Sequence, residues 1–324
     1  MKQWSDHLLC PEELGIHGGR LEEIAVRLVE DQLATWPRLA AGLSNLDNAK
    51  YKTVKNPDNP DDFLLLVQNS GRISNASADL HPDRQCPLCL ENLPLEERGI
   101  AMGSQFVLLP NPDPILRHHL IGTHRDHIEQ RLDTCLPTMI QILSRGIGDL
   151  VIFYNGPSCG ASSPYHAHFQ IGFAGNLPLP TVLDAIQHRM KRPVRNIEHH
   201  ELFGRRFLVL TEPTPQRLAA AVTWLLELGP DSDESPHNLL MWQMEDVFRA
   251  VLFPRGRHRP DVYYKRDPDR IIISPGSVEM AGLIVVPRIM DWERVDADIM
   301  MTIFREVSVD DAVWSTFLRR LSEE

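Results

Sequence analysis

The segment Ser163-Pro164-Tyr165-His166-Ala167-His168-Phe169-Gln170 carries the strongest structural signal in this sequence. It follows an apolar stretch and a turn-forming segment with two glycines, residues 155–160. In an extended strand, side chains two positions apart lie on one face, so His166, His168 and Gln170 are expected to point the same way. Two imidazoles and an amide gathered at the end of a glycine-containing loop make a poor core. This pattern indicates an active site more than a solvated strand face.

Composition limits the class of protein. The net charge of −11 argues against a general nucleic-acid binder, although one locally positive pocket could still take a nucleotide. No apolar run approaches the ~18 residues of a membrane span, and the first residues are too polar for a signal peptide. Five cysteines, two of them in Cys86-Pro87-Leu88-Cys89, do not resemble a disulfide framework. We therefore expect a cytoplasmic protein with no membrane or nucleic-acid partner.

Hydrophobic periodicity predicts a mixture of helices and short strands in both halves of the chain. Helices are expected at residues 19–36, 136–143, 181–191, 215–228, 296–305 and 309–321. Strands are expected at residues 63–68, 106–109, 120–121, 151–154, 166–170, 207–210, 239–244, 248–253, 271–273 and 282–286. A chain of 324 residues exceeds the usual size of one domain, so two domains or one two-part domain is expected. No repeat is visible in the letters.

The His-x-His-x-Gln pattern after an Asn-Gly/Ser-rich loop resembles the active-site strand of the histidine-triad superfamily. It is most similar to the branch with galactose-1-phosphate uridylyltransferase, diadenosine tetraphosphate phosphorylase and the GDP-hexose phosphorylases. Histidine-triad hydrolases usually have a third His where this chain has Gln170, and Gln is typical of the transferases and phosphorylases.

This resemblance implies an α+β fold of two related halves, each an antiparallel sheet packed with helices. In the resembled transferases only the first half carries the catalytic strand, and this sequence has no second His-x-His pattern. We therefore predict a catalytic half with a zinc site at residues 1–195 and a second half at residues 196–324 that completes the substrate pocket.

The pair Cys86 and Cys89 has the C-x-x-C spacing that grips one metal ion through a tight turn. A closed site needs two more ligands, and histidines are abundant nearby. The alternative is that both cysteines are buried small side chains without metal. A redox pair is disfavoured, because no thioredoxin-like βαβ pattern surrounds it.

Residues 119–127 resemble the superfamily segment H-x-L-V-I-P-K-x-H, whose last His is a zinc ligand in the zinc-bearing members. The resemblance implies a structural zinc ion held by Cys86, Cys89, His127 and His166, with His124 as the rival to His127.

In the resembled branch the second His of the motif is the nucleophile, which here is His168, and the Gln, here Gln170, donates to a phosphoryl oxygen. An imidazole attacks phosphorus when one ring nitrogen is free and the other is held by an acceptor. We expect that acceptor to be a backbone carbonyl of residues 155–160.

Glycines and serines of the same loop can form an anion-binding concavity, although an ordinary turn is the alternative. Elsewhere, Arg72 follows a strand, and residues 255–266 form the densest basic segment of an acidic chain. The predicted substrate contacts are Arg72, Asn111, Asn155, Gly160, Ser162, Ser163, Arg255 and Arg259. For the contacts outside the loop, the alternatives are solvated loops and a turn-capping Asn111.

These observations predict a nucleotidyltransferase or nucleoside-phosphate phosphorylase. A nucleoside diphosphate sugar or dinucleoside polyphosphate would transfer its nucleotidyl group to His168, and inorganic phosphate or a sugar phosphate would accept it. Two alternatives are a nucleotide hydrolase of the same fold and a non-catalytic, zinc-stabilised nucleotide-binding protein. Both a homodimer and an internally paired monomer remain open.

Overall fold

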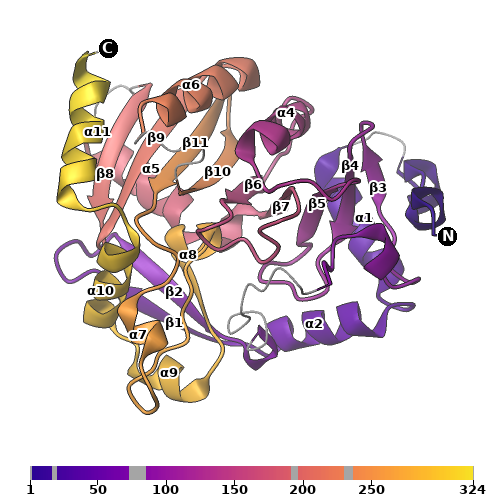
Figure 1. Cartoon of the computed structure of the whole chain (residues 1–324), viewed down its shortest axis with the longest axis horizontal. Helices are drawn as coiled ribbons and strands as arrows, with labels where there is room; N and C mark the ends of the chain where they lie inside the picture. Colours follow the sequence, from indigo (N-terminus) through magenta and orange to yellow (C-terminus); the bar gives the residue numbers. More distant parts are fainter. Residues whose placement is uncertain (1, 17–19, 73–84, 191–195, 230–235, 324) are drawn as a thin grey trace.

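A nine-stranded antiparallel sheet forms the centre of the molecule (Figure 1). The computed structural model describes residues 2–16, 20–72, 85–190, 196–229 and 236–323. Across the sheet the strands are β3 Ile100–Met102, β4 Phe106–Pro110, β5 Leu120–His124, β7 His168–Phe173, β6 Leu150–Asn155, β10 His237–Met244, β11 Val247–Pro254, β9 Arg205–Glu212 and β8 Ile197–Leu202.

The sheet contains a structural repeat that the letters do not show. In the first half, β4 and β5 are followed by helix α4 (Leu132–Leu143) and then by β6 and β7. In the second half, β8 and β9 are followed by helix α6 (Pro215–Glu227) and then by β10 and β11. The sheet orders β4-β5-β7-β6 and β8-β9-β11-β10 match when read from opposite edges, and they meet where β6 pairs with β10. The predicted α+β fold with two related halves is therefore confirmed.

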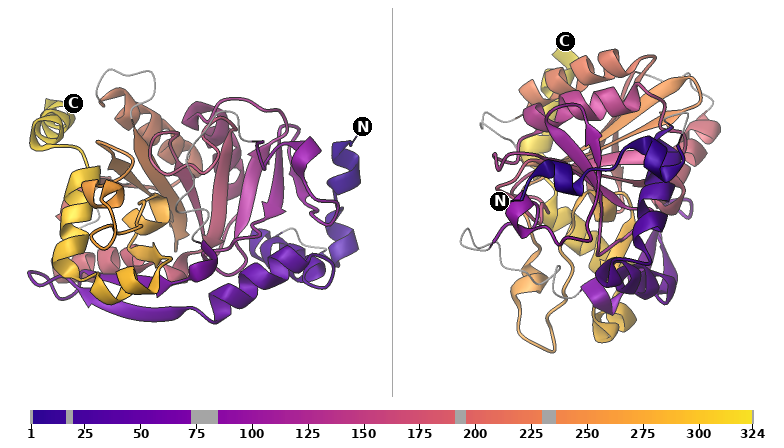
Figure 2. Two further views of the ribbon diagram at one scale, coloured as in Figure 1. Left: turned by 60° about the horizontal axis from the view of Figure 1, so that its bottom comes forward. Right: turned by 90° about the vertical axis from the view of Figure 1, so that its right-hand side faces the viewer.

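A second, smaller sheet ties the end of the chain to its beginning. Strand β2 (Phe63–Gln68) pairs antiparallel with β1 (Lys50–Lys55) and parallel with β12 (Leu283–Val286). Figure 2 shows these early strands running beside the C-terminal helices. Near this sheet, Asp62 and Arg205 form an ion pair of 2.8 Å with both side chains fully buried. Both sheets thus combine strands from either side of the predicted domain boundary. That boundary remains a prediction, and residue 195 lies outside the described residues.

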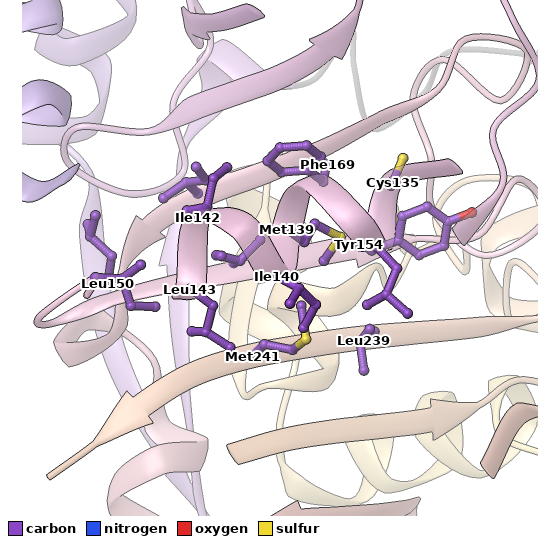
Figure 3. Packing of buried hydrophobic residues seen from close by; sticks show 14 of the residues in the cluster. Cys135, Met139, Ile140, Ile142, Leu143, Leu150, Tyr154, Phe169, Leu239 and Met241 are labelled. Carbon is purple, nitrogen blue, oxygen red and sulfur yellow. The ribbon is translucent and has the colours of Figure 1, made fainter. Parts of the chain in front are cut away.

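The large sheet is buried on both faces. On β6, Ile152 and Tyr154 pack into one apolar cluster, whereas Val151 and Phe153 pack into another on the opposite side. Figure 3 shows the first cluster, where helix α4 packs against β10. A strand buried on both faces reads as a continuous apolar run, which is why the sequence marked β6 clearly.

The remaining helices cover the sheets and the ends of the molecule. They are α1 Leu21–Gln32, α2 Pro37–Asp47, α5 Pro178–Met190, α7 Asp261–Tyr264, α8 Ser277–Met280, α9 Ile289–Arg294, α10 Ala297–Val307 and α11 Asp311–Glu323. Short 3-10 helices are η1 Trp4–His7, η2 Pro11–Leu14, η3 Ser70–Arg72, η4 Leu90–Asn92 and η5 Ala174–Asn176. Within the described residues, no helix combines the length and apolar character needed to cross a membrane.

One predicted strand is wrong. Residues 271–273 are buried but join neither sheet. The Ile272 N–H donates to the Asp291 carboxylate (2.9 Å) instead of to a neighbouring strand. An apolar triplet reports burial, and burial by itself does not specify a strand partner.

Candidate active site and metal cluster

Both halves of the chain line a cavity of about 280 Å³ that contains His168 and Gln170. The two side chains lie on the same face of β7, two positions apart, as expected for a strand. His166 differs from the prediction, because it precedes the strand and does not line the cavity that the described residues form. His168 and Gln170 of the motif therefore line the cavity, whereas His166 lies beside Cys86 and Cys89.

The His168 side chain is buried, and the backbone carbonyl two residues earlier orients its ring. Its Nδ1 lies 2.8 Å from the carbonyl oxygen of His166. A carbonyl only accepts, so Nδ1 carries the proton and Nε2 keeps a lone pair. Burial lowers the pKa of His168, which favours this neutral form. The holder of the ring is thus His166, and the expectation of a carbonyl from residues 155–160 is wrong.

Gln130 fixes the backbone around His168. Its Oε1 accepts from the N–H of His168 (2.7 Å), and its Nε2 donates to the carbonyls of His168 and Asn155, both at 2.9 Å. The side chain is buried and lies just before α4. Gln130 therefore ties the start of β7 to the end of β6. Sequence reasoning missed it, because a single Gln before a helix carries no pattern.

His119 determines how Gln170 is turned. The Ile115 N–H donates to Nδ1 of His119 (3.2 Å), so the ring proton is on Nε2, which donates to Oε1 of Gln170 (2.9 Å). This leaves the amide NH₂ of Gln170 as its donor group. Asn111 lines the cavity as expected, with Oδ1 accepting from the Asp113 N–H (3.0 Å) and Nδ2 3.3 Å from Nδ1 of His119. Asn111 is thus also the turn-capping residue of the alternative interpretation.

Burial of His119 gives a pH-dependent stability. Burial, assisted by Arg72, lowers the pKa of His119 to about 3. As the pH falls, His119 becomes protonated in the unfolded chain before it does so in the folded protein. The contribution of neutral, buried His119 to the free energy of unfolding is therefore complete above about pH 6.5 and is lost as the pH falls towards 3. Each pH unit in this window costs about 1.4 kcal/mol. The free energy of unfolding should fall less steeply in His119→Asn than in the wild-type protein, by about 2 kcal/mol between pH 6.5 and 4.5. Denaturant titrations across this range measure the difference, and equal slopes would contradict it.

Four predicted metal ligands come together. The ligand atoms of Cys86, Cys89, His127 and His166 all lie within 4.8 Å of one another. Cys89 Sγ is 3.0 Å from Nδ1 of His127, and Cys86 Sγ is 3.3 Å from Nδ1 of His166. The set therefore forms a cluster that could hold a metal ion.

The tautomer of His166 suits a metal ligand. Its Nε2 lies 2.8 Å from the carbonyl oxygen of His124 and must donate to it, so Nδ1 presents a lone pair to the cysteines. An outer hydrogen bond of this kind is what orients metal-binding histidines. His124, the rival ligand, instead uses Nδ1 to accept from the Asp126 N–H (3.0 Å). Of the two histidines, His127 belongs to the cluster of ligand atoms and His124 does not.

Of the eight predicted substrate contacts, seven line the cavity that the described residues form and Arg255 does not. The residues that line the cavity are Arg72, Asn111, Asn155, Gly160, Ser162, Ser163 and Arg259. Asn155 also joins the halves, since its Oδ1 accepts from Nδ2 of Asn238 and from the Ser277 N–H, both at 2.7 Å. Gly160 has φ 106°, and a Cβ there would lie 2.7 Å from the Cα of Gly276. Only glycine permits both that conformation and this close approach.

Arg255 requires a correction, because it does not line the cavity that the described residues form. Its buried guanidinium donates to the carbonyls of Val307 (3.0 Å) and Pro275 (2.9 Å) and to the side chain of Asn238. It holds the loops of the second half together. The sequence shows a cluster of basic residues but not which of them faces inward.

Other groups of the cavity wall were not predicted. They include Arg38, Glu97, His258, Ser274 and Glu279. Burial raises the pKa of Glu97 to about 8, so this carboxyl is largely protonated at neutral pH. His258 directly precedes Arg259, which was predicted to contact the substrate, and this adjacency was the one sequence signal for His258.

Comparisons with known proteins agree with this architecture. The family model described as a domain of unknown function, DUF4922, matches residues 28–173. No curated protein matches the chain. The crystal structure of the yeast Ap4A phosphorylase Apa2 is 18% identical, with a TM-score of 0.58, and the match covers 88% of this chain and 97% of the yeast chain.

Two complexes of the same yeast enzyme are nearly as similar. The complex with AMP is 17% identical (TM-score 0.56; 86% and 96% covered), and the complex with Ap4A is 16% identical (TM-score 0.57; 86% and 97% covered). Together with the repeated sheet, this likeness shows that the chain has the same two-halved fold as the yeast Ap4A phosphorylase.

Proposed function

We propose that the protein is a nucleotidyltransferase or nucleoside-phosphate phosphorylase that forms a covalent nucleotidyl intermediate on Nε2 of His168. The observation that carries the proposal is the hydrogen bond from Nδ1 of His168 to the carbonyl of His166 (2.8 Å). It leaves Nε2 unprotonated in a cavity that Gln170 also lines. An oriented, neutral imidazole is the form that attacks phosphorus.

In the first step, Nε2 of His168 attacks the α-phosphorus of the donor. The phosphorus–nitrogen bond forms as the bond to the leaving phosphate oxygen breaks, and the leaving group departs with that electron pair. The Gln170 NH₂ donates to a phosphoryl oxygen, because His119 already occupies its Oε1. A preoriented donor at a developing charge is worth about 3 kcal/mol in transition-state stabilisation. In the second step, the acceptor attacks the same phosphorus and frees His168.

The substrates that we propose are a nucleoside diphosphate sugar or dinucleoside polyphosphate as donor and phosphate or a sugar phosphate as acceptor. The structures of the yeast phosphorylase with AMP and with Ap4A support a nucleotide ligand for this fold. Gln170, where hydrolases carry a third His, supports transfer to a phosphate over transfer to water.

We also propose that Cys86, Cys89, His127 and His166 hold a structural zinc ion. Two thiolates and two imidazoles match the preferred donors of Zn²⁺, and four protein ligands complete its tetrahedral coordination. When bound, the ion would supply rigidity and no open position for substrate. Because the carbonyl of His166 holds the His168 ring, the metal-bound residue would also orient the nucleophile.

The five cysteines form no disulfide, which supports a reducing, cytoplasmic location.

The proposal is tested by mass spectrometry of the intact protein after incubation with a panel of nucleotide donors. We expect an acid-labile mass increase equal to one nucleoside monophosphate less water, which disappears when phosphate or a sugar phosphate is added. The adduct should map to His168. Turnover of a donor without any adduct on wild-type protein, or an adduct that persists in His168→Ala, would contradict the proposal.

A further inference from the structure

The second half of the chain builds a polar wall of the cavity from His258, Arg259 and Ser274. Ser274 Oγ accepts from Nε of Arg259 (3.1 Å) and lies 3.2 Å from Nε2 of His258. Burial and the neighbouring charges of Arg259 and Arg255 lower the pKa of His258 to about 4. His258 is therefore neutral near pH 7, and Arg259 supplies the positive charge of this wall.

Arg259 is held in place before any ligand binds. Its guanidinium lies 4.3 Å from the ring centre of Tyr263, and the residue as a whole is only 9% exposed. A buried, stacked guanidinium loses little further freedom on binding an anion, and its planar donors match phosphate oxygens. The wall also contains one acid, Glu279. Burial raises the pKa of this carboxyl, and its Oε2 accepts from the Gly276 N–H (2.9 Å).

Arg257, two residues away, provides a natural comparison. Its guanidinium pairs with Asp261 (2.5 Å) and Glu306 (2.9 Å), and its side chain is 39% exposed. It does not line the cavity that the described residues form. The same short basic segment therefore contains one arginine inside the cavity and one on the surface.

The position of this wall relative to the nucleophile indicates its role. Gly160 in the Gly/Ser loop touches Gly276, two residues after Ser274, so the wall adjoins the loop that precedes His168. Asn111 and Gln170 line the cavity from the first half. A nucleotidyl group bound to His168 would thus lie in a cavity that first-half residues and the second-half wall line together.

We propose that Arg259, Ser274 and His258 form the acceptor subsite, which binds the phosphate that attacks the nucleotidyl group on His168. This inference rests on the proposed function. An oxygen of HPO₄²⁻ bonds to the phosphorus, and the phosphorus–Nε2 bond breaks with its electron pair returning to His168. The product is a nucleoside diphosphate that keeps the proton of the phosphate, and His168 becomes neutral again. No further reactant is required.

The test separates loading of His168 from its discharge. Nucleoside 5′-phosphorimidazolides carry a neutral leaving group, so they load His168 without needing an anion subsite. The imidazolides of adenosine, guanosine and uridine are compared first, and the one that loads best is kept. Inorganic phosphate is then added, and loss of the adduct is followed by intact mass. Arg259→Gln should load like the wild-type protein but need about 10- to 100-fold more phosphate for half-maximal discharge rate.

Arg257→Gln is the matched control and should discharge like the wild-type protein. Ser274→Ala is a second variant with a smaller expected increase, and it replaces Arg259→Gln if that variant does not fold. Normal phosphate dependence in Arg259→Gln would overturn the acceptor subsite while leaving the covalent intermediate intact. An equal defect in both arginine variants would overturn it too, because it would indicate a general charge effect. Failure of the wild-type protein to load would refute the proposed function, and the subsite with it.

Discussion

His168→Ala is expected to abolish turnover, by on the order of 10⁶-fold, while the fold and the metal content stay as in the wild-type protein. The size follows from the role, because removing a covalent nucleophile removes the whole two-step route. The fold should persist because the hydrogen bonds of Gln130 go to backbone atoms of residue 168, which alanine retains. Steady-state rates and circular dichroism measure the two effects.

His166→Ala is the contrasting variant, two residues away. It removes a cluster ligand, so metal content and thermal stability should fall together. His168→Gly should regain some activity with a nucleoside phosphorimidazolide, since the substrate then carries the missing ring. Initial rates with both substrates varied should show ping-pong kinetics. Wild-type activity in His168→Ala towards the true substrate would refute nucleotidyl transfer through this residue.

Cys89→Ser is expected to lower the free energy of unfolding by on the order of 5 kcal/mol and to release the metal. Binding of structural zinc is coupled to folding and reaches about 10 kcal/mol or more in small zinc domains, so losing one thiolate forfeits a large part of it. Cys89 is buried and contacts both histidines of the cluster, which leaves little scope for compensation. Elemental analysis of protein purified without chelator and thermal unfolding provide the two measurements.

Cys10→Ser is the control, because Cys10 is exposed and outside the cluster. It should keep one zinc ion per chain and an unchanged melting temperature. A chelator should destabilise the wild-type protein and Cys10→Ser but have little further effect on Cys89→Ser. Wild-type protein that contains no metal, or Cys89→Ser with normal stability, would contradict the assignment.

The sequence was sufficient wherever the relevant interactions are local. Strand periodicity placed His168 and Gln170 on one face, and apolar periodicity placed α4, α6 and α10 close to their observed bounds. Two neighbouring cysteines can bind the same metal ion only when a tight turn joins them, and the segment from Cys86 to Cys89 supplies that turn within four residues. The resemblance supplied the other two members of the predicted site, His127 from residues 119–127 and His166 from the His-x-His-x-Gln motif. In the structure, His127 and not His124 lies in the cluster.

By itself, then, the sequence determined the class of fold, the strand that carries His168 and Gln170, and the cysteine pair. Tertiary structure alone decided which carbonyl orients His168, which way Gln170 is turned, and that Arg259 faces the cavity while Arg255 does not. It also created the repeat, in which two dissimilar sequences form the same strand order. The physical reason is common to all of these. Periodicity along a chain specifies which face is buried, whereas hydrogen-bond partners far apart in sequence are chosen only when strands and loops pack together.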